Sequence, residues 1–177
     1  MHHIQLSNTA FEGHNSVYVL GDGDADAPTT LVDTGVATPG VEAELRDALD
    51  GVGVALADVD RVLLTHWHHD HAGLAGAVQA ASGADVFVHE ADADLVAQRG
   101  SAREDLGAAQ EAALREGGLP DDVLDGLLAF REEHRGLRGE PADVTEVTDG
   151  DAVALGPYEA EGVHLPRQAA GLVAYVV

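Results

Sequence analysis

The 177-residue chain contains no cysteine and no lysine, and only 4% of its residues are aromatic. Without cysteine there is no disulfide framework, no thiolate metal site and no cysteine nucleophile. Nowhere do about 18 apolar residues run together, which is the length that a membrane-spanning helix needs. The N-terminus also lacks a basic segment followed by an apolar core, which is typical of a secretory signal. These absences predict a cytoplasmic protein that has no membrane partner.

Positive charge is scarce as well. Nine arginines stand against 32 acidic residues, and the formal net charge is -23. Such a chain repels nucleic acid and anionic membranes, so both are excluded as partners. An apolar content of 45% argues against disorder, and the length is sufficient for one domain with its own core. The composition is similar to that of proteins from salt-accumulating halophiles, which predicts loss of folded structure at low salt; an acidic protein from a GC-rich genome is the alternative.

The most informative segment present is the run Thr65-His66-Trp67-His68-His69-Asp70-His71, which follows an apolar stretch over residues 59–64. We expect residues 61–65 to form a buried strand. An extended backbone directs residues i and i+2 to the same side, so His66 and His68 are suited to bind one ion together. Asp70 and His71 lie at the turn that must follow, where they can face a second position nearby.

Imidazole and carboxylate are ligands that suit zinc, and also iron or manganese. Metal pairs about 3.5–4 Å apart are a recurring means of generating hydroxide from water near neutral pH. The alternative is a solvated histidine-rich loop, but a mixed ligand set between a strand and Gly73 favours a metal site. His2 and His3, at a terminus that we expect to fray, are assigned no role.

Several other segments accompany the histidine run in a fixed order. They are Asn15-Ser16-Val17-Tyr18-Val19-Leu20, Leu31-Val32-Asp33-Thr34-Gly35, residues 60–73, Thr148-Asp149-Gly150-Asp151 and His164-Leu165-Pro166 with the residues to Gly171. On these motifs the chain resembles the metallo-beta-lactamase-fold hydrolases. Within them it is similar to the glyoxalase II-like branch of zinc-dependent enzymes, which cleave thioesters, lactones and related esters. The resemblance covers nearly the whole chain.

The resemblance implies roles for individual residues. It makes His66 and His68 ligands of a first zinc ion, and Asp70 and His71 ligands of a second. The family's third ligand of the first ion is a histidine where this chain has Gln168, so Gln168 is a weak or replaced ligand. The family's bridging aspartate and last histidine ligand have no counterpart here.

The implied fold class is α/β, a metallo-beta-lactamase-like αββα sandwich that looks truncated on its C-terminal side. We expect one incomplete domain over residues 1–177, with a helical insertion at about 91–138. That insertion would serve as a lid or substrate wall, with a dimer face or a plain cover of the core as alternatives. Asp33 would support the metal site from beneath, although a turn-forming role explains it equally well.

The expected elements follow from hydrophobic periodicity and capping residues. Strands are predicted at residues 4–6, 17–20, 30–32, 61–65, 85–88 and 172–177, and helices at 38–49, 74–81, 91–98, 102–116 and 120–135. Within the last helix, an apolar stripe is predicted from Leu124, Leu127, Leu128 and Phe130.

The function implied by the resemblance is hydrolysis of a thioester, lactone or related ester in a small molecule. Metal-activated hydroxide would attack the substrate, and Asp70 would orient it as the catalytic residue. Gln168 and the missing ligands leave two alternatives, a catalytically impaired metal-binding protein and a truncated gene product. A homo-oligomer that donates ligands from a partner subunit would complete the site.

Overall fold

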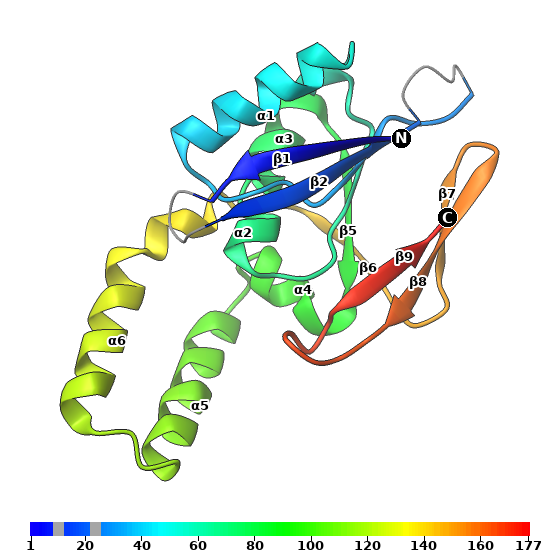
Figure 1. The fold of residues 1–177 in the computed structure, drawn as a ribbon. Helices are drawn as coiled ribbons and strands as arrows, with labels where there is room; N and C mark the ends of the chain where they lie inside the picture. Colours follow the sequence, from blue (N-terminus) through cyan, green and yellow to red (C-terminus); the bar gives the residue numbers. More distant parts are fainter. Residues whose placement is uncertain (9–12, 22–25) are drawn as a thin grey trace.

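The computed structural model describes residues 1–8, 13–21 and 26–177, which form two sheets and a set of helices (Figure 1). The large sheet has the order β1-β2-β3-β4-β5-β6. Its strands are β1 His2–Ser7, β2 His14–Leu20, β3 Thr30–Val32, β4 Arg61–Leu63, β5 Asp85–His89 and β6 Val144–Val147. The first three pair antiparallel, and β3 to β6 run parallel. The small sheet is antiparallel and consists of β7 Ala152–Leu155, β8 Tyr158–His164 and β9 Val173–Val176.

The longer helices lie close to their predicted ranges, whereas the short helix His69–Ala72 and the two 3-10 turns were not predicted. The helices are α1 Pro39–Gly51, α2 His69–Ala72, α3 Ala75–Ser82, α4 Glu90–Val96, α5 Ala102–Glu116 and α6 Asp121–Glu133, with the 3-10 turns η1 Leu56–Asp58 and η2 Arg135–Arg138. Helix α1 shows the local reason. The Thr38 side chain accepts a hydrogen bond from the backbone N–H of Val41, and Pro39 occupies the first turn. None of the described helices is long and apolar enough to cross a membrane.

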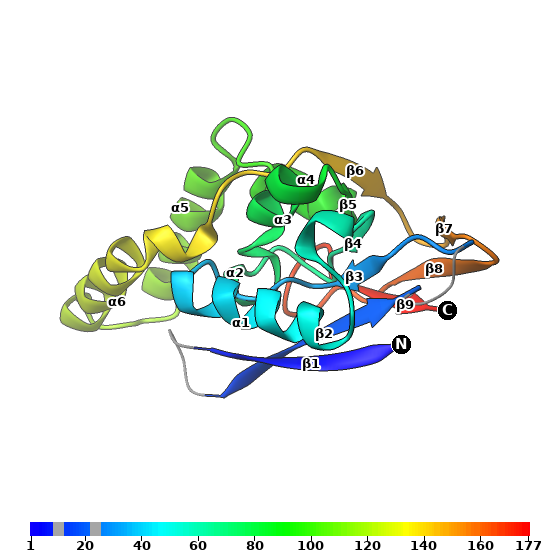
Figure 2. The same cartoon turned by 90° about the horizontal axis from the view of Figure 1, so that it is seen from above.

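The core has two parts, one on each face of the large sheet. Neighbouring residues of β4 show the division, since Val62 packs on the helix side and Leu63 on the side of the small sheet. On the helix side lie the three predicted buried positions of α1, which are Val41, Leu45 and Leu49. On the other side, Leu63 meets Val153 and Leu155 of the small sheet. The layers are therefore helices, large sheet and small sheet, as Figure 2 shows edge on, which confirms the expected α/β sandwich class.

Helices α5 and α6, which we call the helical arm, project from this body (Figures 1 and 2). No residue of α5 is buried, and Leu124 is the buried residue of α6. Leu127 and Phe130 are 39% and 41% exposed. The predicted apolar stripe of α6 is therefore covered at Leu124 and exposed at Leu127 and Phe130.

Two smaller expectations are also corrected. His2 and His3 belong to β1 instead of a frayed end, and His3 stacks on Tyr18 and hydrogen-bonds to Ser16 Oγ at 2.8 Å. The strand predicted at residues 61–65 ends at Leu63. Beyond it, the backbone N–H of Thr65 donates to the Asp33 carboxylate at 2.8 Å, and not to a backbone carbonyl of a neighbouring strand.

Candidate metal centre

The histidine loop, residues 65–71, carries three imidazole rings that converge beyond the end of β4. The ring centroids of His66 and His68 lie 4.7 Å apart, and those of His66 and His71 lie 4.3 Å apart. His68 directly precedes α2, where its backbone oxygen accepts the N–H groups of His71 and Ala72 at 2.9 and 2.8 Å. The short helix thereby turns the chain so that the His71 ring lies close to the rings of His66 and His68, which come from the extended part of the loop.

Gln168 comes to the same place from the loop between β8 and β9, a hundred residues later. Its Nε2 lies 3.5 Å from His66 Nε2 and 3.3 Å from His68 Nδ1. The amide therefore lies next to both ring nitrogens, where a third ligand of one metal ion would be expected. A half turn about the last side-chain bond would present Oε1 there, and an amide oxygen is a metal ligand, although weaker than imidazole toward zinc.

The donor set of this site is thus unusual. Among the described residues, no three His, Cys, Asp or Glu side chains form a group that could hold a metal ion. The two imidazole nitrogens and an amide oxygen from Gln168 are donors of the kinds that a zinc ion accepts. His164 is not available as a replacement, because its ring stacks on His89 at 3.9 Å and its Nε2 bonds to the Ala170 carbonyl at 2.7 Å.

Asp70 and His71 lie next to this point. Asp70 Oδ2 is 3.6 Å from His71 Nε2 and accepts a hydrogen bond from Asn15 Nδ2 at 3.0 Å. Burial acts to raise the pKa of Asp70, but the Asn15 bond and the nearby His71 outweigh it, and the pKa lies below the usual value. Asp70 is therefore held ionised, as a metal ligand must be.

Asp33 lies beneath the histidine loop in the left-handed backbone region, at φ 62°. Its carboxylate accepts the hydroxyl of Thr65 at 2.9 Å and the Nδ1–H of His71 at 2.7 Å, besides the Thr65 backbone N–H. Burial lowers the pKa of His71, but the Asp33 bond and charge raise it above its usual value overall. A proton fixed on Nδ1 leaves Nε2 of His71 as the nitrogen that faces Asp70.

The pKa values of His66 and His68 are shifted in the opposite direction to that of His71. Burial, followed by the neighbouring His71 and His68, lowers the pKa of His66 to about 4. Burial is also the main cause that lowers the pKa of His68. Both rings are consequently neutral at physiological pH, which is the form that coordinates a cation.

Sequence reasoning missed Asp92, a fully buried carboxylate on α4. It accepts the backbone N–H of Trp67 at 3.1 Å and that of Gly171 at 2.9 Å, and so ties the histidine loop to the loop that carries Gln168. Gly171 has no room for a side chain, since a Cβ there would lie 2.6 Å from Asp92 Cγ. No local pattern marks Asp92, which is one of several acidic residues in its helix, and Asn15 was likewise given no role.

A cavity of about 360 Å³ opens beside the site. Trp67, His68 and Gln168 form one side of it. Helices α4 and α5 form the other, with Leu95 and Leu106 among the lining residues. The helical arm therefore supplies part of the wall next to the candidate metal ligands.

The comparisons with known proteins agree with this fold and with the grouping of histidines at one site. Residues 10–176 match the metallo-beta-lactamase superfamily, and the chain belongs to this family. A curated relative, the probable metallo-hydrolase YqjP of Bacillus subtilis (strain 168), is 41% identical over 66 residues. That match covers 37% of this chain and 20% of the relative.

Solved structures share the fold. The metallo-beta-lactamase family protein TTHA1429 from Thermus thermophilus superimposes with a TM-score of 0.77 at 24% identity, over 98% of this chain and 54% of that one. The metallo-beta-lactamase SMB-1, solved bound to 2-mercaptoethanesulfonate, gives a TM-score of 0.67 at 24% identity over the same shares. The chain thus spans about half the length of these structures.

Proposed function

We propose that this chain is a zinc-binding hydrolase unit that acts on a thioester, lactone or related ester of a small molecule. His66 and His68, with Gln168 as a weak third ligand, would hold one ion, and Asp70 and His71 would contribute to a second. The observation that carries the proposal is the meeting of His66 Nε2, His68 Nδ1 and the Gln168 amide beside the 360 Å³ cavity. Iron and manganese suit the same donors.

Bound zinc would supply Lewis acidity and lower the pKa of water. The chain's own residues prepare for it. Asn15 keeps Asp70 ionised, so that Asp70 can accept a hydrogen bond from the attacking water and orient it. Asp33 fixes the His71 ring, and Asp92 keeps the Gln168 loop against the histidine loop. Leu95, Leu106 and Trp67 offer apolar contact to an acyl group in the cavity.

A second candidate, a catalytically impaired metal-binding protein, is favoured by Gln168 itself. An amide at the third position weakens a zinc site, and the Asp70–His71 pair offers two donors where a stable site usually has three or more. A homo-oligomer that adds donors from a partner subunit would favour the hydrolase. The proposed setting of either form is the cytoplasm, with neither nucleic acid nor membrane as a partner.

The first experiment measures zinc affinity by competition with a chromophoric chelator. We expect Gln168→His to bind zinc at least tenfold more tightly than the wild type, because imidazole replaces an amide. Gln110→His is the matched control, since Gln110 is exposed on α5 and lines the same cavity away from the two imidazoles. Equal affinity in wild type, Gln168→His and His66→Ala would contradict the proposed site.

Hydrolysis of a panel of thioesters and lactones separates the two candidates. The hydrolase predicts zinc-dependent turnover by the wild type that His66→Ala abolishes. The impaired binder predicts weak zinc binding by the wild type without turnover, with Gln168→His as the variant most able to restore activity. Equal turnover in wild type and His66→Ala would contradict the hydrolase proposal, because the activity would then come from a contaminant or from another site.

A further inference from the structure

The few arginines of this acidic chain are unevenly distributed. Six of the nine fall within residues 99–138, which span the helical arm and its two ends. Arg115 lies at the far end of α5, and the other five are considered together. They are Arg99, Arg103, Arg131, Arg135 and Arg138. With a net charge of -23, a random placement would surround each cation with carboxylates. The clustering therefore needs a reason.

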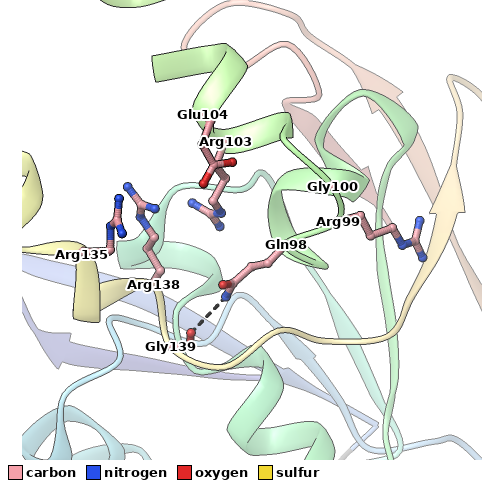
Figure 3. Close-up of a pocket in the computed structure, with 8 residues that line it drawn as sticks. All are labelled: Gln98, Arg99, Gly100, Arg103, Glu104, Arg135, Arg138 and Gly139. Carbon is pink, nitrogen blue, oxygen red and sulfur yellow. Dashed lines mark hydrogen bonds between the residues drawn. The ribbon is translucent and has the colours of Figure 1, made fainter. Parts of the chain in front are cut away.

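Three of these side chains face one hollow, between the start of α5 and η2 (Figure 3). Arg103 comes from α5, and Arg135 and Arg138 come from η2, around a cavity of about 210 Å³ that we call the arginine hollow. A second cavity, lined by the same three arginines, adds Arg131 of α6. Arg99 turns away toward β6, where its Nη1 pairs with Glu146 at 3.3 Å (Figure 3).

The cations in the hollow are poorly neutralised. Arg135 pairs with Glu132 at 3.2 Å, but within the described part of the chain Arg103 and Arg138 form no ion pair. The Nε of Arg103 is buried and has no hydrogen-bond partner among the described residues. Glu104 is the carboxylate that lines the hollow, and it stands against three guanidinium groups.

Burial, followed by the charge of Arg138, lowers the pKa of Arg103 to about 10. Burial and the charges of Arg135 and Arg131 lower the pKa of Arg138 as well. These shifts reflect the cost of holding like charges together, and an anion between them would relieve it. The guanidinium of Arg103 is also fixed in place, because it lies 5.4 Å from the centre of the Trp67 ring.

We infer that the arginine hollow is a binding site for a phosphate-type oxyanion, either free or as the end group of a small molecule. Planar guanidinium groups donate paired hydrogen bonds that match the oxygens of such a group. The cavity volume is suited to one small anion, and the second cavity next to it has room for an attached organic part. A nucleic acid strand does not suit the hollow, since the rest of the surface repels it.

The position of the hollow gives the anion a structural role. Helix α5 separates it from the cavity at the metal centre, with Ala102 and Leu106 on one side and Arg103 on the other. A bound oxyanion would join α5 to η2 through hydrogen bonds from Arg103 and Arg138. It would thereby hold the wall of the neighbouring cavity in place.

The test is calorimetric titration of metal-free protein with inorganic phosphate and with glucose 6-phosphate, at constant ionic strength and with chloride as the reference anion. We expect saturable binding that Arg138→Gln weakens about tenfold, the loss expected for one charge-assisted hydrogen bond. Arg46→Gln, which removes an exposed arginine of α1, is the matched control and should bind as the wild type does. Tighter binding of glucose 6-phosphate would identify an organic ligand, and equal binding would identify the phosphate group alone.

Glu104→Gln provides an opposite effect, since removal of the lining carboxylate should strengthen binding at least twofold. His66→Ala should leave binding unchanged, because the metal centre takes no part in it. The inference is overturned if neither anion binds more tightly than chloride, if Arg138→Gln and Arg46→Gln bind alike, or if His66→Ala abolishes binding.

Discussion

The histidine loop and the helical arm meet at Trp67 and are built in opposite ways. The backbone N–H of Trp67 bonds to buried Asp92, and its ring lies 4.5 Å from that of His68. The guanidinium of Arg103, from the arm, also lies over the ring, 5.4 Å from its centre. In the loop, Asp33, Asp92 and Asn15 each satisfy specific polar groups. In the arm, no whole residue of α5 is buried, and Arg103 faces Arg135 and Arg138 of η2 across the arginine hollow.

This difference shows what holds each region in one conformation. Buried polar groups that are paired fix a single geometry, because any departure leaves a donor or acceptor without a partner. An exposed arm with unbalanced charge lacks this constraint, and its position depends on salt and ligands. Chemistry that needs exact placement is therefore expected in the loop, and regulation or selectivity in the arm.

The largest expected effect is that of salt, which tests the halophile-like composition that we propose. In low salt, repulsion within a chain of net charge -23 should destabilise the fold, and molar KCl should restore it. Hydrogen exchange in decreasing KCl should show α5 and α6 opening before the strands around the histidine loop. A thermal melt that does not depend on KCl, or an arm that opens last, would contradict the comparison.

Asp92→Ala should break the loop itself. It leaves the N–H groups of Trp67 and Gly171 without their acceptor, at a cost of about 2–5 kcal/mol in the free energy of unfolding. Asp94→Ala, on the same helix but exposed, should change that free energy by less than about 0.5 kcal/mol. Urea unfolding of both variants measures the difference, and similar midpoints would refute the role of Asp92.

Asp33→Asn should loosen the histidine loop with less damage. Asparagine tolerates the positive φ at this position, but it removes the charge that holds the Nδ1–H of His71. We expect zinc affinity to fall by about 10–100-fold. Asp47→Asn, an exposed acid of α1, serves as the control in the same chelator competition. An unchanged affinity in Asp33→Asn would assign that residue to the turn alone.

The smallest effect concerns pH. The His66 pKa is lowered from 6.5 to about 4, so between these two values the unfolded chain binds a proton that the folded chain does not. The stability of metal-free protein should therefore rise with pH across this window and fall as the pH drops toward its lower end. The His71 pKa is raised, so NMR of the two rings should show titration on opposite sides of 6.5. If His66 is the cause, the stability of His66→Gln should depend less steeply on pH than that of the wild type, and an equal dependence would contradict this.

Much of the fold was predictable because its signals are local. The alternation of β1 and β2, the cap and apolar spacing of α1, and the family order of motifs are all readable within a few residues of one another. The family assignment is confirmed by the match over residues 10–176. The exposure of Leu127 and Phe130 on α6 was not predictable, because periodicity shows that a helix has an apolar side but not whether a neighbour covers it.

The sequence by itself determined the histidine run, the class of fold and the substitution at Gln168. Only the tertiary structure decided that the Gln168 amide meets His66 and His68, that Asp92 joins two distant loops, and that Arg103 faces Arg138. The physical reason is sequence separation. Backbone geometry relates residues a few positions apart, whereas contacts across a hundred residues arise from the packing of the whole core.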